Sequence, residues 1–305
     1  MKPLPGGAEY EISADGYVAA VSQVGASLRV LRHGRRDLVA SHPVDVVRPV
    51  YRGAVLAPWP NRIADGRYEL DGVTQQVPVN EVDRMNALHG LVAWAPWQLV
   101  EHVQHQVVLA YRLHPLDGYP FMLDLQVAYR LGRHGLEWEI ACVNVGDDPA
   151  PYGCALHPYL VAGAGRVDDW TLTLPAEQYL TVSADRLLPV GLEPVADTGF
   201  DFRTPRPIGT TLLDHAFTRL VRDENGHATV TVTDASGAGV AMRWDEAWPW
   251  VQIHTADRPE PELNRCGLAV EPMTCPPDAF NSGHDLVTLQ PGDEHRARWH
   301  VCALP

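Results

Sequence analysis

The sequence predicts an all-β protein, a large twisted antiparallel β-sandwich, and three observations support this prediction. Apolar residues alternate with polar ones over much of the chain, as they do in strands that bury one face. The 25 glycines and 26 prolines are spread throughout and suit many short strands better than long helices. The sequence also lacks a convincing amphipathic helix of more than a few turns.

Three segments show the strand pattern most clearly. The first reads as a strand, a break at Gly25, a second strand and a turn, and the other two are hairpins whose alternating runs flank a turn. They are residues 17–39 with the turn at 33–36, residues 123–131 and 136–142 around the turn 132–135, and residues 228–232 and 240–244 around the turn 234–237. Consecutive hairpins of this kind build antiparallel sheets.

One segment, residues 183–210, is proline-rich and irregular. It still contains Leu187, Leu188, Phe200 and Phe202, so we expect an ordered excursion over a sheet and no domain boundary. The chain contains no repeat of fixed period and no low-complexity linker. We therefore predict a single domain over residues 1–305, a length that β-sandwiches often use as one unit.

Composition limits the partners and the compartment. The chain has 24 Lys plus Arg against 38 Asp plus Glu, which argues against nucleic acid and anionic membrane surfaces as partners. The N-terminus lacks an apolar signal core, and no run approaches the roughly 18 apolar residues of a membrane span. The five cysteines, an odd number without C-x-x-C spacing, favour a reducing compartment. We expect a cytoplasmic protein with a small-molecule partner, either a monomer or a homodimer.

Among the polar residues, Glu271 is the most informative. It follows the apolar run 267–270 and precedes Pro272, with two further prolines close behind. Desolvation at the end of a buried strand raises the pKa of a carboxyl group, and a general base requires such a raised pKa. The alternative is a strand-end glutamate in an ion pair.

Two histidines beside conformationally special residues are candidates for a site. His89 precedes Gly90 in an expected loop, and a loop histidine can present its ring to a cleft. His157 precedes Pro158, and a following proline favours an extended backbone that would aim the imidazole. A structural role is the alternative for each, because lone histidines are more often structural than catalytic.

Polar residues of interest occur in three further segments, although Asp214 alone carries little weight. Asn61 and Arg62 follow a Pro-Trp-Pro loop, and together they can bond several hydroxyl groups. Asp214 stands at an expected turn, where a local side-chain cap is the simpler explanation. Gln252 offers an amide that can both donate and accept hydrogen bonds.

Two tryptophans, Trp248 and Trp250, stand just before Gln252. Aromatic faces stack on the C–H surfaces of sugars, so these residues suit a sugar platform. They are equally suited to a place in the core.

The sequence indicates neither a metal site nor a cofactor site. His102 and His105 are three apart in a strand-like stretch, a spacing that predicts opposite faces of a strand. Motifs for zinc, calcium, nucleotide phosphates and a serine nucleophile are absent. Cys154 and Cys275 are interpreted as packing residues, since no motif for thiol chemistry surrounds them.

Several short segments in a fixed order give a further signal. They are Asn61-Arg62-Ile63-Ala64-Asp65-Gly66, Leu88-His89-Gly90, His157-Pro158-Tyr159, Asp214, Gln252, Ala269-Val270-Glu271-Pro272 and Pro277-Asp278-Ala279. Together they resemble the aldose 1-epimerase (galactose mutarotase) family, and in particular a bacterial branch with a Pro-Trp-Pro-Asn-Arg-Ile loop. The resemblance covers nearly the whole chain. Leu91 and Leu160 depart from the family pattern, which usually has a second Gly and an Asn-Leu pair, respectively.

The resemblance implies a large twisted β-sandwich with an open cleft, in agreement with the strand pattern. It also implies an isomerase that interconverts the anomers of a free aldohexose without a cofactor. By resemblance, Glu271 is the general base, His157 the general acid, and His89 a second site histidine near the ring oxygen. The residues that resemble the binders of the sugar hydroxyls are Asp214, Arg62, Asn61 and Gln252.

Two alternatives remain open. A non-catalytic sugar sensor on the same fold would keep the hydroxyl-binding residues and could lose Glu271 or His157, and both of these are present. An epimerase for an anionic sugar, phosphorylated or sulfonated, would need arginines at the cleft. Arg62, Arg67 and Arg84 lie in suitable segments.

Overall fold

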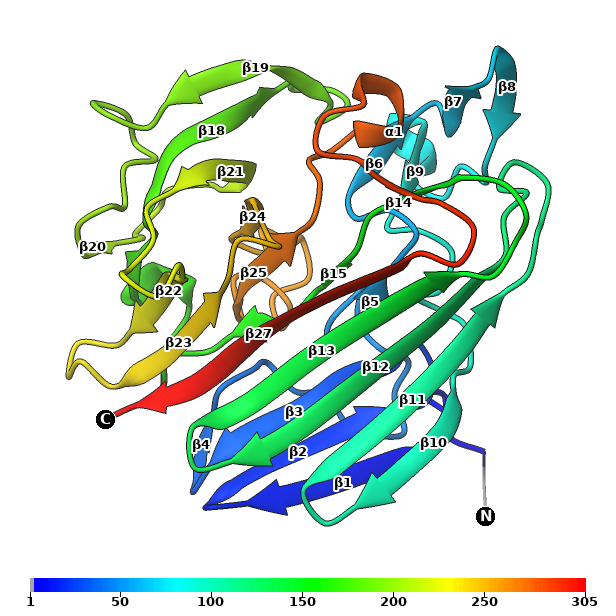
Figure 1. Ribbon diagram of the computed structural model, residues 1–305. Coiled ribbons are helices and arrows are strands. Elements are labelled where there is room, and N and C mark those ends of the chain that lie inside the picture. The colour runs from blue at the N-terminus through cyan, green and yellow to red at the C-terminus, as the bar shows by residue number, and fades with distance from the viewer. Residues whose placement is uncertain (1–2) are drawn as a thin grey trace.

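Two large antiparallel sheets form the body of the structure, a computed structural model that describes residues 3–305 (Figure 1). The first sheet has nine strands in the order β10-β11-β12-β13-β27-β23-β22-β17-β20. Their bounds are β10 (Gln98–Val103), β11 (Gln106–Leu113), β12 (Leu123–Gly132), β13 (Gly135–Asn144), β17 (Thr171–Thr173), β20 (Arg206–Pro207), β22 (Ala228–Thr233), β23 (Gly239–Trp244) and β27 (Glu294–Leu304).

The second sheet has eight strands in the order β19-β18-β21-β24-β25-β15-β5, with β16 also paired to β25. This sheet positions most of the candidate site. Its strands are β5 (Val55–Leu56), β15 (Ala155–Leu156), β16 (Tyr159–Leu160), β18 (Ala176–Val182), β19 (Pro189–Pro194), β21 (Asp214–Leu220), β24 (Trp250–His254) and β25 (Leu268–Met273).

Four smaller sheets complete the fold. A four-stranded sheet at the N-terminus contacts β11 and β12 of the nine-stranded sheet, and it lies behind that sheet in Figure 1. It contains β1 (Glu9–Ala14), β2 (Tyr17–Ser22), β3 (Ser27–His33) and β4 (Arg36–Asp37). The three two-stranded ribbons are β6 (Arg62–Ala64) with β9 (Asn86–Leu88), β7 (Arg67–Leu70) with β8 (Val73–Gln76), and β14 (Ala150–Tyr152) with β26 (Val287–Leu289).

Helical structure is minor in the described part of the chain. It consists of one helical turn, α1 (Ala279–Ser282), and two short 3-10 helices, η1 (Val82–Arg84) and η2 (Val167–Asp169). No helix within residues 3–305 has the length and apolar character needed to cross a bilayer. The predicted all-β antiparallel sandwich is confirmed.

The predicted hairpins correspond to strand pairs in the structure. β12 pairs with β13 from Leu123↔Asn144 to Gly132↔Gly135, and β22 pairs with β23 in the same antiparallel manner. Residues 17–39 form β2, β3 and β4. Alternate residues of β12, including Leu125 and Val127, are buried as the period-two pattern requires.

A single hydrophobic cluster joins the sheets. It includes Leu28 from the four-stranded sheet, Val127 and Trp138 from the nine-stranded sheet, and Val251 and Val270 from the eight-stranded sheet. Because successive strand residues point to opposite faces, residues next to these core positions face away from the cluster. This alternation directs Gln252 of β24 and Glu271 of β25 away from the cluster, although both side chains are buried.

Three local expectations need correction. The segment 183–210 is ordered, but it also supplies edge strands to both large sheets, β19 and β20. Asp214 is the first residue of strand β21, and so the turn expected at this position is wrong. His102 lies on β10, whereas His105 lies in the turn after it, so the two do not share one strand.

Candidate active site

The floor of the candidate site is formed by three adjacent strands, β21, β24 and β25. The register pairs Asp214 with His254 and Gln252 with Glu271. Directly opposed residues project from the same face of a sheet, as do residues two apart along one strand. All four side chains therefore lie on one face, and Val270 beside Glu271 enters the core instead.

The ribbon of β6 and β9 brings Asn61 and His89 together. The backbone N–H of His89 donates to the carbonyl of Asn61 over 2.8 Å, and the N–H of Asn61 donates to Nδ1 of His89 over 3.2 Å. Both residues have positive φ, 54° for Asn61 and 63° for His89. Non-glycine residues in this region are strained and tend to occur at functional sites, where the surrounding structure fixes them.

The position after His89 requires a glycine, Gly90. Its φ is +71°, and a Cβ atom there would lie 2.1 Å from the carbonyl oxygen of Ala57. A side chain at this position would therefore displace the backbone that carries His89.

His157 lies between β15 and β16, which both pair with β25. Its backbone N–H donates to the carbonyl of Ala54, and its carbonyl accepts from the N–H of Gly53. Nε2 of His157 lies 3.4 Å from Oε1 of Glu271. The imidazole stacks on the ring of Tyr159 at 5.1 Å, which fixes its orientation.

Arg62 is held in place by Glu81, a residue that the sequence analysis did not select. Nε and one terminal nitrogen of Arg62 donate to the two carboxylate oxygens of Glu81 over 2.8 and 2.9 Å. Asn86 also donates to Glu81 over 2.8 Å. Such a bidentate pair orients a guanidinium group, and Arg62 also donates to the side-chain oxygen of Asn61.

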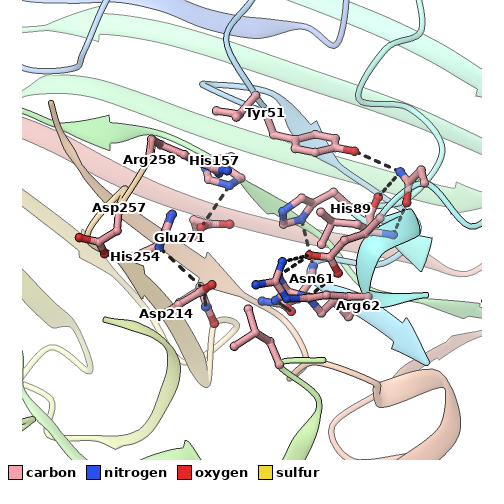
Figure 2. A pocket seen from close by; sticks show the side chains of 17 residues that line it. Tyr51, Asn61, Arg62, His89, His157, Asp214, His254, Asp257, Arg258 and Glu271 are labelled. Carbon is pink, nitrogen blue, oxygen red and sulfur yellow. Dashed lines mark hydrogen bonds and ion pairs between the residues drawn. The ribbon is translucent and has the colours of Figure 1, made fainter. Parts of the chain in front are cut away.

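These side chains surround one cavity of about 330 Å³, near the lower end of the roughly 300–1,000 Å³ range of ligand pockets. Figure 2 shows Glu271, His157, His89, Arg62 and Asp214 around this space. All seven predicted site residues line it. The full lining is Val50, Tyr51, Asn61, Arg62, Asn80, Glu81, Arg84, Leu88, His89, His157, Leu187, Asp214, Gln252, His254, Asp257, Arg258 and Glu271.

Several buried polar atoms in this cavity have no hydrogen-bond partner within residues 3–305. They are Oε2 of Glu271, Oε1 of Gln252, Nδ1 of His157, and Nε of both Arg84 and Arg258. Buried polar groups in proteins are nearly always satisfied, so each exception calls for an explanation. Five such atoms in residues around one cavity indicate that the site is built for a polar ligand.

Burial opposes charge on the two central groups. Desolvation, followed by repulsion from Asp214, raises the pKa of Glu271 well above its usual value, although Arg62 acts in the opposite direction. Desolvation, followed by the charge of His254, lowers the pKa of His157 from 6.5 to about 3. A buried carboxyl group that binds protons readily stands beside a buried imidazole that resists them.

The pKa values of Asp214 and His89 are both lowered, which fixes the charge of each side chain. Burial raises the pKa of Asp214, but His254, Arg62 and the hydrogen bond from Gln252 outweigh burial and lower it below 3.8. Burial, with His157 and Arg62, lowers the pKa of His89 well below 6.5. Asp214 is therefore an anionic acceptor, and His89 is neutral.

His89, His157 and Glu271 offer donor atoms within 4.8 Å of one another, which raises the question of a metal ion. Nδ1 of His89 accepts a hydrogen bond from the backbone of Asn61. In neutral His89 the proton is therefore on Nε2, which makes that atom a hydrogen-bond donor and not a metal ligand. The donor set suits a hydroxyl group better than a metal ion.

The structure distinguishes between several alternatives left by the sequence. Trp248 and Trp250 have 0% and 1% of their surface exposed and do not line the cavity, so they are core residues and not a sugar platform. Of the three arginines considered for an anionic substrate, Arg62 and Arg84 line the cavity and Arg67 does not. Burial raises the pKa of Cys154 to about 12, which agrees with a packing role.

Further residues that line the cavity were not predicted from the sequence. His254 is two residues after Gln252, and period-two alternation would have placed it on the same face. Tyr51 packs edge-on against His89 at 4.6 Å, and Arg258 lies in a loop after β24. No local sequence signal identifies Tyr51, Glu81 or Arg258, because long-range folding alone brings them to the cavity.

Comparison with known proteins adds independent information. The family model described as Aldose 1-epimerase matches residues 8–302. The chain is 39% identical over 297 residues to the uncharacterized protein YihR of Escherichia coli (strain K12), across 97% of this chain and 93% of that protein. It is 30% identical over 273 residues to the galactose mutarotase of Mus musculus, across 80% and 76% of the two chains.

A solved structure shares the fold. The GalM/aldose epimerase homologue from C. elegans superimposes with a TM-score of 0.85, over 98% of this chain and 99% of that chain. The two sequences are 21% identical in this alignment, so the comparison concerns the architecture.

Proposed function

The chain belongs to the aldose 1-epimerase family, and we propose that it interconverts the α and β anomers of a free aldohexose. The observation that supports this most directly is the 3.4 Å approach of His157 Nε2 to Glu271 Oε1 in a buried cavity. Mutarotation needs one group that removes the proton of the C1 hydroxyl and another that protonates the ring oxygen. A carboxylate and an imidazole side by side meet this need.

In this mechanism Glu271 accepts the proton of the C1 hydroxyl while His157 donates a proton to the ring oxygen. The C1–ring oxygen bond breaks and gives the open-chain aldehyde. Rotation about the C1–C2 bond presents the other face of the aldehyde, and the ring closes as both protons return. The two side chains thus exchange acid and base roles in each half of the reaction.

The environment of the pair determines the protonation states of Glu271 and His157 before and after ring opening. The opening step converts a carboxylate and an imidazolium ion into a neutral carboxyl group and a neutral imidazole. Burial raises the pKa of Glu271 and lowers the pKa of His157 to about 3, so this conversion discharges two groups that the protein disfavours as ions. Because the neutral pair is the resting form, the ion pair that begins ring opening must first form by proton transfer from Glu271 to His157, and the cost of that transfer cancels the gain.

The remaining polar residues are suited to hold the sugar. Nε2–H of His89 is a donor, Asp214 is an anionic acceptor, and Oε1 of Gln252 is an acceptor without a protein partner in the described chain. Arg62 keeps N–H groups that Glu81 does not use. These groups match the alternating donors and acceptors of sugar hydroxyls.

The proposal is tested by following freshly dissolved α-glucose and α-galactose to anomeric equilibrium by polarimetry. We expect the protein to accelerate the approach, and Glu271→Gln or His157→Asn to lower the rate by about 10²–10⁴-fold. Glu294→Gln, which changes an exposed glutamate on β27, is the matched control. Near-normal turnover by either site variant would remove that residue from its role.

A non-catalytic sugar sensor is distinguished by the same series. Calorimetric titration of glucose and galactose should show binding to both the native protein and Glu271→Gln. Sugar binding without any acceleration by the native protein would support the sensor and contradict the mutarotase.

A second candidate substrate, an anionic aldose, is favoured by Arg258. Its side chain lines the cavity, and it forms no ion pair with a carboxylate within the described chain. Its Nε is also buried there without a hydrogen-bond partner. An arginine without a carboxylate partner in a binding cavity is suited to a phosphate or sulfonate group.

The two substrates are compared in one assay, with glucose and glucose 6-phosphate as the neutral and anionic probes. If the anionic sugar is the substrate, Arg258→Ala should reduce kcat/KM for glucose 6-phosphate by about tenfold or more and leave the value for glucose nearly unchanged. Equal effects on both sugars would contradict a charge-recognition role.

A further inference from the structure

One wall of the cavity is supplied by the hairpin that connects β18 and β19, and Arg186 fastens the tip of that hairpin to the opposite side. Nε of Arg186 donates to the carbonyl of Arg84 over 2.9 Å. A terminal nitrogen donates to the carbonyl of Met85, to Asp65 over 2.8 Å and to the side-chain oxygen of Asn86 over 3.2 Å. The side chain of Asn86 donates back to the carbonyl of Arg186 over 3.0 Å.

This clamp connects the hairpin to a residue that faces the ligand. Asn86 also donates to Glu81, and Glu81 holds Arg62 through two hydrogen bonds. The hairpin and the Arg62 side chain are therefore linked through only two intervening residues. Arg186 itself does not line the cavity.

The next residue, Leu187, presents its side chain to the cavity. Its φ is 54°, a value that is uncommon for leucine and must be maintained by its surroundings. The Arg186 contacts and the hydrogen bond from Leu187 N–H to the carbonyl of Ser183 supply that restraint. Leu187 is thus a fixed apolar group in a mostly polar lining.

Sheet topology indicates which part of a sugar would meet Leu187. Glu271 on β25 and His157 beside β15 and β16 lie at one side of the floor, whereas the hairpin rises from β18, beyond β21. A pyranose with C1 and its ring oxygen at the Glu271–His157 pair directs the opposite end of its ring toward β21 and β18. The carbon opposite C1 in a pyranose is C4.

We infer that Leu187, held by Arg186, is a specificity-determining residue that restricts the site to single sugar rings by occupying the space of a substituent at C4. This inference rests on the proposed mutarotase function and extends it. The protein accelerates mutarotation of glucose and galactose and discriminates against maltose and lactose, whose reducing glucose carries its substituent at C4. Arg186 is a positioning residue in this arrangement, because it acts through Leu187 and Arg62.

The test measures kcat and KM for glucose and for maltose with the native protein, Leu187→Ala, Arg186→Ala and Arg186→Lys. Leu187→Ala should raise kcat/KM for maltose relative to glucose by about tenfold, since it removes apolar volume from the wall. Arg186→Ala should raise KM for glucose several-fold with little change in kcat. It should also reduce the discrimination against maltose relative to glucose. Arg186→Lys should recover part of the lost affinity.

Arg203→Ala is the matched control, because Arg203 lies nearby in the sequence, between β19 and β20, and pairs only locally with Asp201 over 2.6 Å. Hydrogen exchange provides a readout independent of activity. The amides of residues 183–188 should exchange faster in Arg186→Ala than in the native protein, and their exchange rates should be unchanged in Arg203→Ala. If the native protein is active and both Leu187→Ala and Arg186→Ala keep its maltose-to-glucose ratio, the inference is overturned and the mutarotase proposal stands. No acceleration on any sugar by the folded native protein would overturn both.

Discussion

At the scale of single residues, the pairing of Glu271 with His157 gives the cavity its chemical character. An exposed glutamate would have an ordinary pKa and an exposed histidine would titrate near neutrality. Burial moves the two pKa values apart and in the direction that disfavours both ions. The pair consequently holds one proton over a wide pH range, and our mechanism uses that one proton in both directions.

The first prediction concerns the pH dependence of catalysis. The singly protonated pair should persist from the lowered pKa of His157, about 3, up to the raised pKa of Glu271. We therefore expect kcat/KM, corrected for spontaneous mutarotation, to fall by less than about threefold as the pH is lowered from about pH 7 to pH 5. A free imidazole with a pKa near 6.5 would instead produce a clear transition in this interval. A loss of about tenfold or more by a protein that remains folded would contradict the expectation.

The second prediction concerns stability. Because the folded-state pKa of Glu271 is raised, the folded state binds the proton more tightly than the unfolded state does. The associated stability is present below the unfolded pKa of about 4.3 and is lost as the pH rises through the folded value, at about 1.4 kcal/mol per pKa unit. The side chain introduced by Glu271→Gln cannot ionise, so this variant does not lose that stability as the pH rises.

We therefore expect the melting temperature of Glu271→Gln, minus that of the native protein, to increase between about pH 4.5 and pH 8. Differential scanning calorimetry at several pH values measures this difference. A difference that is independent of pH would mean that the pKa of Glu271 is not raised in the folded protein.

At the scale of secondary structure, the β6–β9 ribbon shows how a short element can aim two side chains. Asn61 and His89 flank the paired residues, and each bonds the other through the backbone or the ring. Their positive φ values mean that the ribbon ends in a conformation that the surrounding chain must maintain. Gly90 permits this by allowing the backbone to pass close to Ala57.

The third prediction tests that close approach. Gly90→Ala should lower the free energy of unfolding by about 2 kcal/mol or more and reduce sugar affinity, because the new Cβ would displace the His89 loop. Gly132→Ala is the control, since nothing lies within 4 Å of a Cβ at that position. Chemical denaturation measures both variants, and equal stabilities would contradict the packing argument.

The β21–β24–β25 floor illustrates the value of strand alternation. One face of these strands carries Asp214, Gln252, His254 and Glu271, and the other contributes Val251 and Val270 to the core. Each strand packs into the core with one face and carries site residues on the other. The regular spacing of the sheet therefore fixes the distances between the functional groups. A shift in register would move the polar residues into the core, so the core itself protects the site geometry.

At the scale of the whole molecule, the two large sheets and the N-terminal sheet share one hydrophobic cluster. The single-domain organisation predicted for residues 1–305 stays a prediction, and the shared cluster supports it. Trp248 belongs to this cluster, is fully buried, and donates from its indole N–H to the carbonyl of Arg298 on β27. It therefore links the loop before β24 to the nine-stranded sheet.

The fourth prediction follows from that position. Trp248→Phe should destabilise the whole protein by roughly 1–3 kcal/mol while the folded protein keeps its sugar affinity, since Trp248 does not line the cavity. The native protein and the variant should each unfold in one transition by calorimetry. Two separate transitions would contradict a single domain. A selective loss of sugar affinity would instead indicate that Trp248 stacks on the sugar.

Much of this protein was predictable from the sequence for one physical reason, namely that strand burial and turn formation are local. Alternating residues in 123–142 predict a hairpin because each strand must bury one face, and Gly90 and Pro158 restrict the backbone beside the two histidines. The order of the short segments indicated the family. Glu271 was identifiable because a carboxylate in an apolar run is exceptional.

Only the tertiary structure decided which groups surround the cavity and how they are charged. Tyr51, Glu81, Leu187 and Arg258 come from loops far apart in the chain, and their positions depend on which strands become neighbours. Trp248 and Trp250 suited a sugar platform or a core equally well until packing placed them in the interior. The sequence by itself determined the strands and the chemical types at the site, because these depend on neighbours along the chain. Long-range contacts determined the desolvation and the 3.4 Å distance between Glu271 and His157, because these depend on neighbours in space.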